Sequence, residues 1–194
     1  MPNYPSRISG RCLMAAMLAI LFLFSSAPLS AAETSTYSQM EIVKSGHKFF
    51  GKFSADLASV VEHVFRKKGR PTAYIVGEEG GGAFIAGVRY GEGWLRMKKA
   101  SQSKIYWQGP SLGLDLGAQG SRIMILVYKL DRSEDMIRNF TGVEGSAYMV
   151  GGVGTTFLTN GRITLAVIRT GLGLRLGLNV GYLKFTRKPT WNPF

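Results

Sequence analysis

The stretch 77–95, GEEGGGAFIAGVRYGEGWL, contains seven glycines and the adjacent carboxylates Glu78 and Glu79. A phosphate-binding P-loop needs a lysine followed by serine or threonine after its glycines, and this stretch has neither. A dinucleotide-binding turn leads from a strand into a helix, whereas residues 83–90 have the pattern of a strand. Glycines within strands permit tight curvature and close approach of neighbouring strands. The stretch therefore predicts a curved, glycine-rich sheet.

The strand pattern extends from residue 72 to the end of the chain. Short apolar segments are bounded by glycine and polar residues at regular spacing, as in an antiparallel sheet system. Abundant glycine favours a closed sheet over a flat one. We expect a mainly β protein, with a small antiparallel β-barrel of about eight strands over residues 72–194 and one or two N-terminal helices packed outside. Residues 131–140 predict a short helix between strands.

Residues 33–71 have helical patterns. Ser38 and Glu41 have the spacing of a capping box, which predicts the start of a first helix. Residues 54–68 place apolar side chains on one helical face and basic ones in the last turn. Gly69 is expected to end this second helix.

Residues 1–32 have the composition of a secretory signal peptide. A basic segment precedes the apolar run 13–24, and small residues follow up to Ala32. The apolar run is short of the roughly 20 residues that a membrane-spanning helix needs. We expect export to the periplasm with cleavage near Ala32, leaving residues 33–194 as a single folded unit. That unit contains no cysteine, because Cys12 is removed with the signal peptide.

The chain is strongly basic. Its formal net charge is +12, and removal of the signal peptide leaves 22 basic residues against 12 acidic ones. Because the protein is expected to be exported, nucleic acid is not expected as its partner, and the charge favours an anionic lipid, a glycolipid or a cell-wall polymer. Peripheral contact with a membrane follows from the same charge, although solubility alone would also account for it. Nothing in the sequence indicates an oligomeric state.

Two segments, 113–120 and 173–181, share the pattern Gly-Leu-x-Leu-Gly. Asp115 occupies the position in the first that Arg175 occupies in the second, so the two would pair if both strands faced one interior. Two unrelated strand surfaces are the alternative. Trp107 stands beside a Gly-Pro turn, which suits a ligand-binding mouth or ordinary packing at a strand end. The candidate ligand-binding residues are Glu78, Glu79, Trp107, Asp115 and Arg175.

The sequence predicts no catalytic residues, no cofactor and no metal site. Glu78 and Glu79 face opposite sides of a strand, so they do not form an acid–base pair with each other. His47 is expected in a Gly-His-Lys linker and His63 on the second helix. Neither belongs to a recognisable triad or zinc-binding pattern.

Three long motifs carry a resemblance to a known family: YIVGEEGGGAFIAGVRYGEG, YWQGPSLGLDLGAQGSR and the C-terminal GYLKFTRKPTWNPF. The chain resembles, from about residue 37 to 194, the EipA-type envelope-integrity proteins, an exported alphaproteobacterial domain of unknown function. The resemblance implies a small periplasmic β-barrel needed for envelope integrity, with no established catalytic residues.

The chain is also similar to SYLF lipid-binding domains. The likeness consists of the glycine-rich strand 80–87, the Trp-x-x-Pro-Ser turn 107–111, and residues 113–118 followed by an apolar strand. The chain departs from those domains in its acidic pair and its C-terminal tail. This similarity suggests lipid binding.

These observations lead to one hypothesis and two alternatives. We expect a non-enzymatic periplasmic protein that supports the envelope by binding an envelope lipid, glycolipid or wall component. The first alternative is an integral outer-membrane β-barrel, whose outward strand faces would be apolar. The second is an envelope-acting hydrolase or transferase that uses Glu78 or Glu79 as acid or base.

Overall fold

The computed structural model describes residues 35–51, 54–82, 86–112, 121–143, 146–170, 181–190 and 192. The predicted signal peptide lies outside these residues. The helices within them are α2 (Gln39–Phe50), α3 (Ser54–Lys68) and the short 3-10 helix η2 (Ser133–Met136). The strands are β1 (Ala73–Gly82), β2 (Ala86–Met97), β3 (Ala100–Leu112), β4 (Ser121–Tyr128), β5 (Asn139–Gly142), β6 (Tyr148–Val150), β7 (Val153–Thr159), β8 (Thr164–Thr170) and β9 (Tyr182–Thr186).

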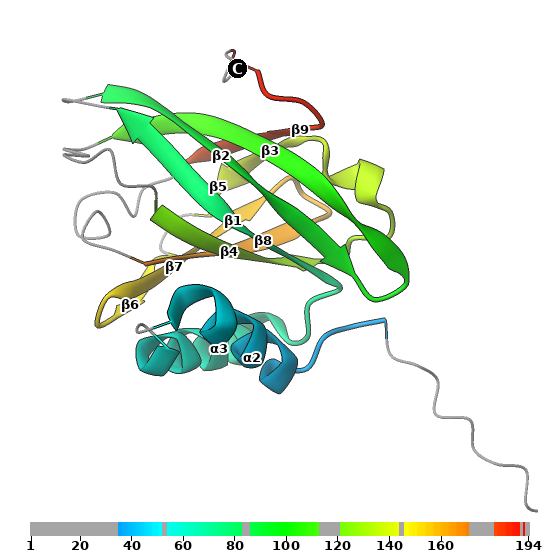
Figure 1. Cartoon of the computed structure of the whole chain (residues 1–194), viewed down its shortest axis with the longest axis vertical. Helices are drawn as coiled ribbons and strands as arrows, with labels where there is room; N and C mark the ends of the chain where they lie inside the picture. The colour runs from blue at the N-terminus through cyan, green and yellow to red at the C-terminus, as the bar shows by residue number, and fades with distance from the viewer. Residues whose placement is uncertain are drawn as a thin grey trace, which may run out of the picture. The chain divides into compact units, whose positions relative to one another are not determined.

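The described strands form one antiparallel sheet that closes on itself. Their order is β5-β9-β3-β2-β1-β4-β8-β7-β6, and a further pairing of β5 with β7 joins eight of them into a ring. Strand β6 adds to β7 outside this ring (Figure 1). The predicted antiparallel barrel of about eight strands is confirmed.

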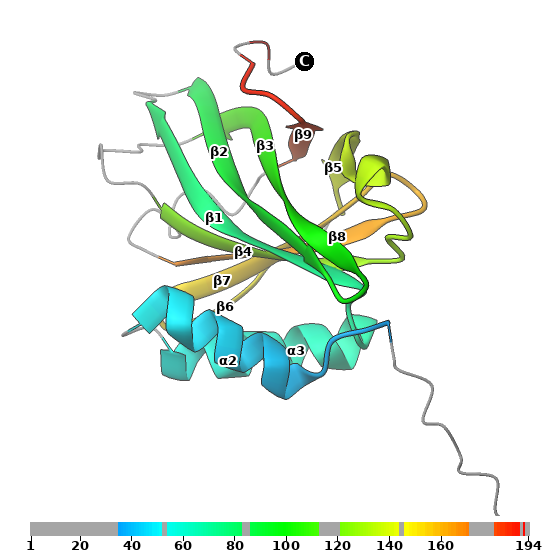
Figure 2. The same ribbon diagram turned by 45° about the vertical axis from the view of Figure 1, so that its right-hand side comes forward.

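Strand β4 separates two hydrophobic cores, because it is apolar on both faces. Ile123, Ile125 and Val127 belong to the core inside the barrel. Met124 and Leu126 belong to a second core between the barrel and the helices. Successive side chains of a strand point to opposite faces, so a strand covered on both sides must be apolar throughout. Figure 2 shows both helices on one outer side of the barrel.

The interior of the barrel is packed with side chains over the region described. The inner core includes aliphatic residues from β1, β2, β4, β7 and β8, and three large aromatic side chains. The ring of Phe185 lies 5.9 Å from that of Trp107 and 5.5 Å from that of Phe140, measured between centroids. A barrel of eight strands is just wide enough to be filled in this way. These residues therefore form a solid scaffold rather than a channel.

The capping box and the end of the second helix are confirmed. The Ser38 N–H donates to the Glu41 carboxylate at 2.7 Å, and the Glu41 N–H donates to Ser38 Oγ at 3.3 Å. Helix α3 ends at Lys68, and Gly69 follows it with a positive φ of 73°. Such a conformation strains residues other than glycine, which explains the stop at this position.

The predicted position of His47 in a linker is wrong, since His47 lies inside α2. The glycine before it does not break the helix. A side chain at Gly46 would overlap Leu57 of α3, so glycine lets the two helices pack closely at this point. Neither helix that covers the barrel has the length and apolar character needed to span a bilayer.

The helix predicted over residues 131–140 is reduced to η2. Residues 139–142 form β5 instead, pairing with both β9 and β7. This strand completes the ring, and Phe140 is fully buried inside it. Long-range pairing has therefore overridden the local helical pattern.

Candidate functional site

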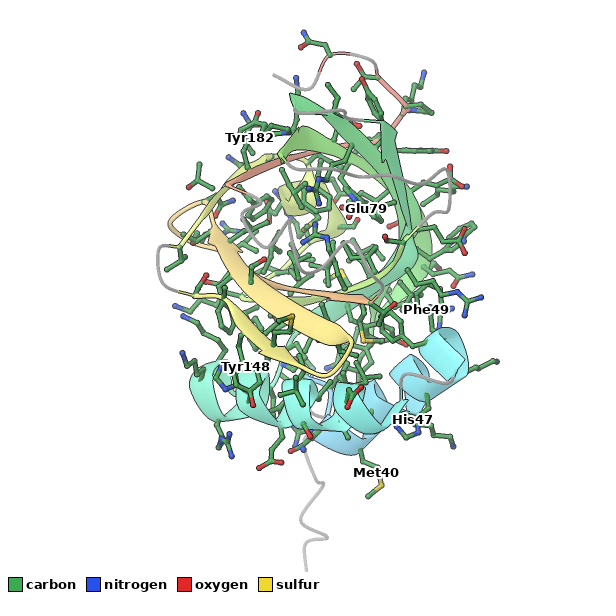
Figure 3. All side chains as sticks on the ribbon, turned by 90° about the vertical axis from the view of Figure 1, so that its left-hand side faces the viewer. Met40, His47, Phe49, Glu79, Tyr148 and Tyr182 are labelled. Carbon is green, nitrogen blue, oxygen red and sulfur yellow. The ribbon has the colours of Figure 1, made fainter. Side chains whose placement is uncertain are left out.

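The glycine-rich strand β1 directs one of its two adjacent carboxylates into the barrel. Glu79 is 6% exposed, whereas Glu78 is exposed on the outer face. Figure 3 shows Glu79 within the ring of strands. Nearby, Gly77 lies opposite Gly93 of β2, and a Cβ on either would overlap the facing backbone. These glycines therefore allow β1 and β2 to approach each other closely, as the sequence predicts.

Glu79 is held by side chains from three other strands. Arg169 of β8 contacts both carboxylate oxygens, from Nε to Oε2 at 2.8 Å and from Nη2 to Oε1 at 3.1 Å. The indole Nε1 of Trp107 on β3 donates to Oε1 at 2.8 Å. Nη1 of Arg89 on β2 lies 3.6 Å from Oε2. The four side chains form a buried cluster, which we call the Glu79 cluster.

Strand register explains how Trp107 reaches Glu79. Glu79 lies opposite Gly91 on β2, and Gly91 lies opposite Trp107 on β3. A Cβ at Gly91 would overlap the indole ring, so the missing side chain leaves the space that the ring occupies. The indole of Trp107 on β3 therefore extends across β2 to reach Glu79 on β1.

The Glu79 carboxylate is ionised in this environment. Burial by itself raises its pKa, but the charge and hydrogen bonds of Arg169, the charge of Arg89 and the hydrogen bond from Trp107 oppose that effect. Together these groups hold the pKa of Glu79 below its usual value. A carboxylate with such partners stabilises the fold and is poorly suited to donate a proton as a general acid.

The structure brings together two of the five residues proposed from the sequence, Glu79 and Trp107. Trp107 is fully buried inside the barrel. Glu78 lies on the outer face, apart from them. Asp115 and Arg175 lie outside the described residues, as do the two Gly-Leu-x-Leu-Gly segments.

Sequence reasoning missed both arginines of the cluster. Arg169 is a single cation near the end of the apolar segment 163–170, which is the signal that could have identified it. Arg89 lies among the glycines of the stretch 77–95, on the same face of β2 as Gly91 and Gly93. When a strand has glycines on one face, a long cationic side chain on that face can extend into the space that the glycines leave open.

Neither histidine belongs to a metal-binding cluster. Within the described ranges, no three histidine, cysteine, aspartate or glutamate side chains gather closely enough to hold a metal ion. The ring of His63 on α3 stacks on that of Tyr148, with 3.7 Å between centroids and 3° between planes. This contact joins α3 to β6.

A groove is formed by residues of β2, β3 and the segment that follows β9. It has a volume of about 210 Å³ and is lined by Tyr90, Gly91, Tyr106, Trp107, Gln108, Pro189 and Thr190. Gln108 is 1% exposed, and its Nε2 has no hydrogen-bond partner among the described residues. The groove is mainly apolar, and the amide nitrogen of Gln108 is buried rather than accessible from it.

One end of the barrel carries a concentration of positive charge. Register places the start of β1 beside the ends of β2 and β4, and the end of β7 beside the start of β8. Four basic parts of the chain adjoin these strand ends: residues 66–70 before β1, residues 96–99 at the end of β2, residues 129–132 after β4, and residue 162 before β8. We call their exposed cations the basic pole: Arg66, Lys67, Lys68, Arg70, Arg96, Lys98, Lys99, Lys129, Arg132 and Arg162.

Several cations of the basic pole are not neutralised by neighbours. Carboxylates pair with Arg66, Lys98, Arg132 and Arg162. The other members make no ion pair with any carboxylate in the described part of the chain: Lys67, Lys68, Arg70, Arg96, Lys99 and Lys129. The basic pole is thus an electropositive surface.

Comparisons with known proteins agree with this fold. The chain is 54% identical in sequence to a β-barrel-like, uncharacterized protein from Brucella abortus, and the comparison with the crystal structure of that protein gives a TM-score of 0.78. The match covers 83% of this chain and 100% of that one. No curated protein matches the chain. The family described as envelope integrity protein A matches residues 35–194, and the chain therefore belongs to that family.

Proposed function

We propose that this protein supports the cell envelope from the periplasm, without catalysing a reaction, by binding anionic lipid through its basic pole. The observation that carries the proposal is a group of six exposed cations at one end of the barrel, none of which forms an ion pair with a carboxylate among the described residues. A lysine or arginine close to an anionic lipid surface contributes about 1 kcal/mol of binding free energy. Six such residues acting together suffice for stable but reversible attachment. The family name supports a role in envelope integrity.

Vesicle binding tests this proposal. The protein is sedimented with vesicles of phosphatidylglycerol mixed with phosphatidylcholine, and with vesicles of phosphatidylcholine alone, at low and high salt. We expect binding only to the anionic vesicles, and weakening as salt screens the charges. Equal binding to both kinds of vesicle, or none to either, would refute the proposal.

A matched pair of variants locates the binding surface. Lys67→Glu with Lys99→Glu removes two unpaired cations of the basic pole, and we expect vesicle affinity to fall about thirtyfold or more. Lys44→Glu with Lys48→Glu makes the same change in net charge on the exposed side of α2. This control should retain most of the affinity. Similar losses in both variants would mean that net charge, and not the basic pole, determines binding.

The hydrolase alternative is poorly supported by the two carboxylates on which it depends. Glu79 makes its contacts with arginines and an indole, and Glu78 points to the opposite side of the sheet. A Glu78→Gln variant that fully restores envelope integrity to a deletion strain would argue against catalysis by this residue. Loss of function without loss of folded protein would revive the alternative.

The outer-membrane alternative is opposed by the outer faces of the barrel. Helices α2 and α3 cover the apolar outer face of β4 and its neighbours. On β2 and β3, the outward positions include Glu92, Arg96 and Lys104, all exposed. A membrane-spanning barrel needs a continuous apolar band on its outer surface. Recovery of the folded protein without detergent would decide the question.

A further inference from the structure

A large apolar side chain is exposed beside the basic pole. Trp94 of β2 is 42% exposed. It points to the outer face of the barrel, as does Arg96, which lies two residues, or about 7 Å, further along the strand. Arg96 is a member of the basic pole. An exposed indole therefore adjoins the surface that we propose to bind anionic lipid.

Trp94 is carried by a hairpin whose turn lies at the basic pole. Strands β2 and β3, with 12 and 13 residues, are the longest strands in the described part of the chain. The turn between them contains Lys98 and Lys99, and Figure 2 shows this turn close to the start of α2. There, Nζ of Lys98 lies 2.8 Å from Oε1 of Glu41. The hairpin is therefore held to the helices at its tip, and Trp94 has a defined position relative to the basic pole.

Cations lie on two sides of the indole. Arg96 follows it along β2, and Lys104 of β3 is directly opposite it in the strand register. Nζ of Lys104 lies 5.8 Å from the centroid of the Trp94 ring. Tryptophan beside long basic side chains is the combination found at the boundary between lipid headgroups and acyl chains, where the ring is partly buried and the charges stay near the phosphates.

Two carboxylates mark where such a contact ends. Glu92 is the next outward-facing residue of β2 on the side away from the basic pole, and Glu78 of β1 is opposite it. Both are exposed. The charge of Glu92 is compensated by Lys104, whose Nζ lies 2.8 Å from its Oε1. An anionic surface would be repelled by Glu78, so the contact should extend from the basic pole as far as Trp94 and no further.

We propose that Trp94 inserts into the headgroup region of an anionic membrane when the basic pole binds that membrane. Because the indole stands on the side wall of the barrel, its insertion requires the barrel to tilt towards β2 and β3. The inference rests on the proposed function and adds to it an apolar anchor and an orientation. Insertion removes the exposed part of the ring from water, while the indole N–H retains hydrogen-bond acceptors among the headgroups.

Met149 provides a comparison at the other end of the barrel. It is 44% exposed, which is close to the value for Trp94. It lies on β6, which pairs with the start of β7, whereas the basic pole adjoins the end of β7. A membrane bound at the basic pole should therefore leave Met149 in water. A substitution at Met149 removes an exposed apolar side chain without affecting the proposed contact.

Fluorescence quenching in vesicles tests the insertion of Trp94. The chain has three tryptophans, of which Trp107 is fully buried, and Trp191→Phe removes the third. This protein is mixed with vesicles of phosphatidylglycerol and phosphatidylcholine that carry bromine on their acyl chains. We expect a blue shift and quenching of the emission, and neither change after the further substitution Trp94→Phe.

The same samples separate this inference from the proposed function. Sedimentation with the anionic vesicles reports binding, and quenching reports insertion. Sedimentation without quenching of Trp94 would refute the insertion and leave the proposed function intact. No sedimentation with anionic vesicles would refute both.

Affinities of variants give an independent measurement. For Trp94→Ala we expect vesicle affinity to fall about tenfold, because the apolar contact is lost. Salt does not screen apolar burial, so this loss should be the same at every salt concentration at which binding is measurable. The loss caused by Lys67→Glu with Lys99→Glu should shrink as salt is added. Met149→Ala is the control and should bind as the wild type does. Unchanged affinity in Trp94→Ala, or an equal loss in Met149→Ala, would refute the anchor.

Discussion

Trp107 on β3 donates a 2.8 Å hydrogen bond to Glu79 on β1, although strand β2 lies between these two strands. Gly91 on that intervening strand is opposite both residues, and its lack of a side chain provides the space for the indole. The same carboxylate is held from the other direction by Arg169, across β4. One buried group thus connects strands on both sides of β1, and its geometry fixes their register.

Replacing Gly91 by alanine should destabilise the protein. The added methyl group would overlap the ring of Trp107, and relief of that overlap would move the indole away from Glu79. Overpacking of this kind typically costs about 1–3 kcal/mol. The free energy of unfolding, obtained from denaturant titration followed by circular dichroism, measures the effect.

Gly80→Ala is the matched control for that substitution. Gly80 also lies in the glycine-rich stretch, but a Cβ there would meet no atom of the described residues within 4 Å. We expect the control to change stability by less than about 0.5 kcal/mol. Similar losses in both variants would show that loss of glycine itself, rather than contact with Trp107, is responsible.

The layered architecture could be predicted because it depends on local pattern. The apolar run of β4 indicates a strand buried on both faces, and the capping box at Ser38 indicates where a helix begins. Glycine frequency indicates close strand approach, which Gly77 and Gly93 show directly. Each of these patterns involves residues that are close together in the sequence, so it can be recognised without knowing which distant segments pair.

The Glu79 cluster could be predicted only in part, because its contacts depend on register between distant segments. Glu79 is 90 positions from Arg169 and 28 from Trp107 in the sequence. Alternation along β1 separates Glu78 from Glu79 but does not say which of them faces inward. The helix predicted over residues 131–140 is wrong for the same reason, because β5 forms by pairing with the distant strands β7 and β9.

Substitution of Glu79 by glutamine should be strongly destabilising. It removes the negative charge that faces Arg169 and Arg89, and leaves these cations in the barrel without that carboxylate. Removing one partner of a buried ion pair typically costs about 3–5 kcal/mol. Glu78→Gln, on the exposed face, should change the free energy of unfolding by no more than about 0.5 kcal/mol. Equal effects of the two substitutions would contradict the assigned role of Glu79.

The same carboxylate should make stability depend on acid pH. Its folded-state pKa lies below the ordinary value of 4.5, so its contribution is fully present above that value and is lost as pH falls through the folded-state pKa. The difference in free energy of unfolding between the wild type and a Glu79→Gln variant should therefore be constant near neutrality and shrink below about pH 4.5. Denaturant titrations of both proteins from pH 7 to pH 3 measure this difference. A gap that stays constant throughout would show that the pKa of Glu79 is not lowered in the folded protein.

His63 should titrate at a lower pH than an ordinary histidine, because burial, Lys67 and Arg66 all disfavour its protonated form. Its pKa, followed by the ring resonances in an NMR titration, is expected below 6.5. Since the unfolded chain then binds a proton more readily, the folded protein loses stability as pH falls from 6.5 through the folded-state pKa. Lys67→Gln removes one of the two nearby cations while the stacking partner Tyr148 is untouched, so the pKa of His63 should rise towards 6.5 in this variant. If the pKa were unchanged by Lys67→Gln, burial against Tyr148 rather than the charge of the basic pole would control this histidine, and the reach of the electropositive surface would be shorter than we infer.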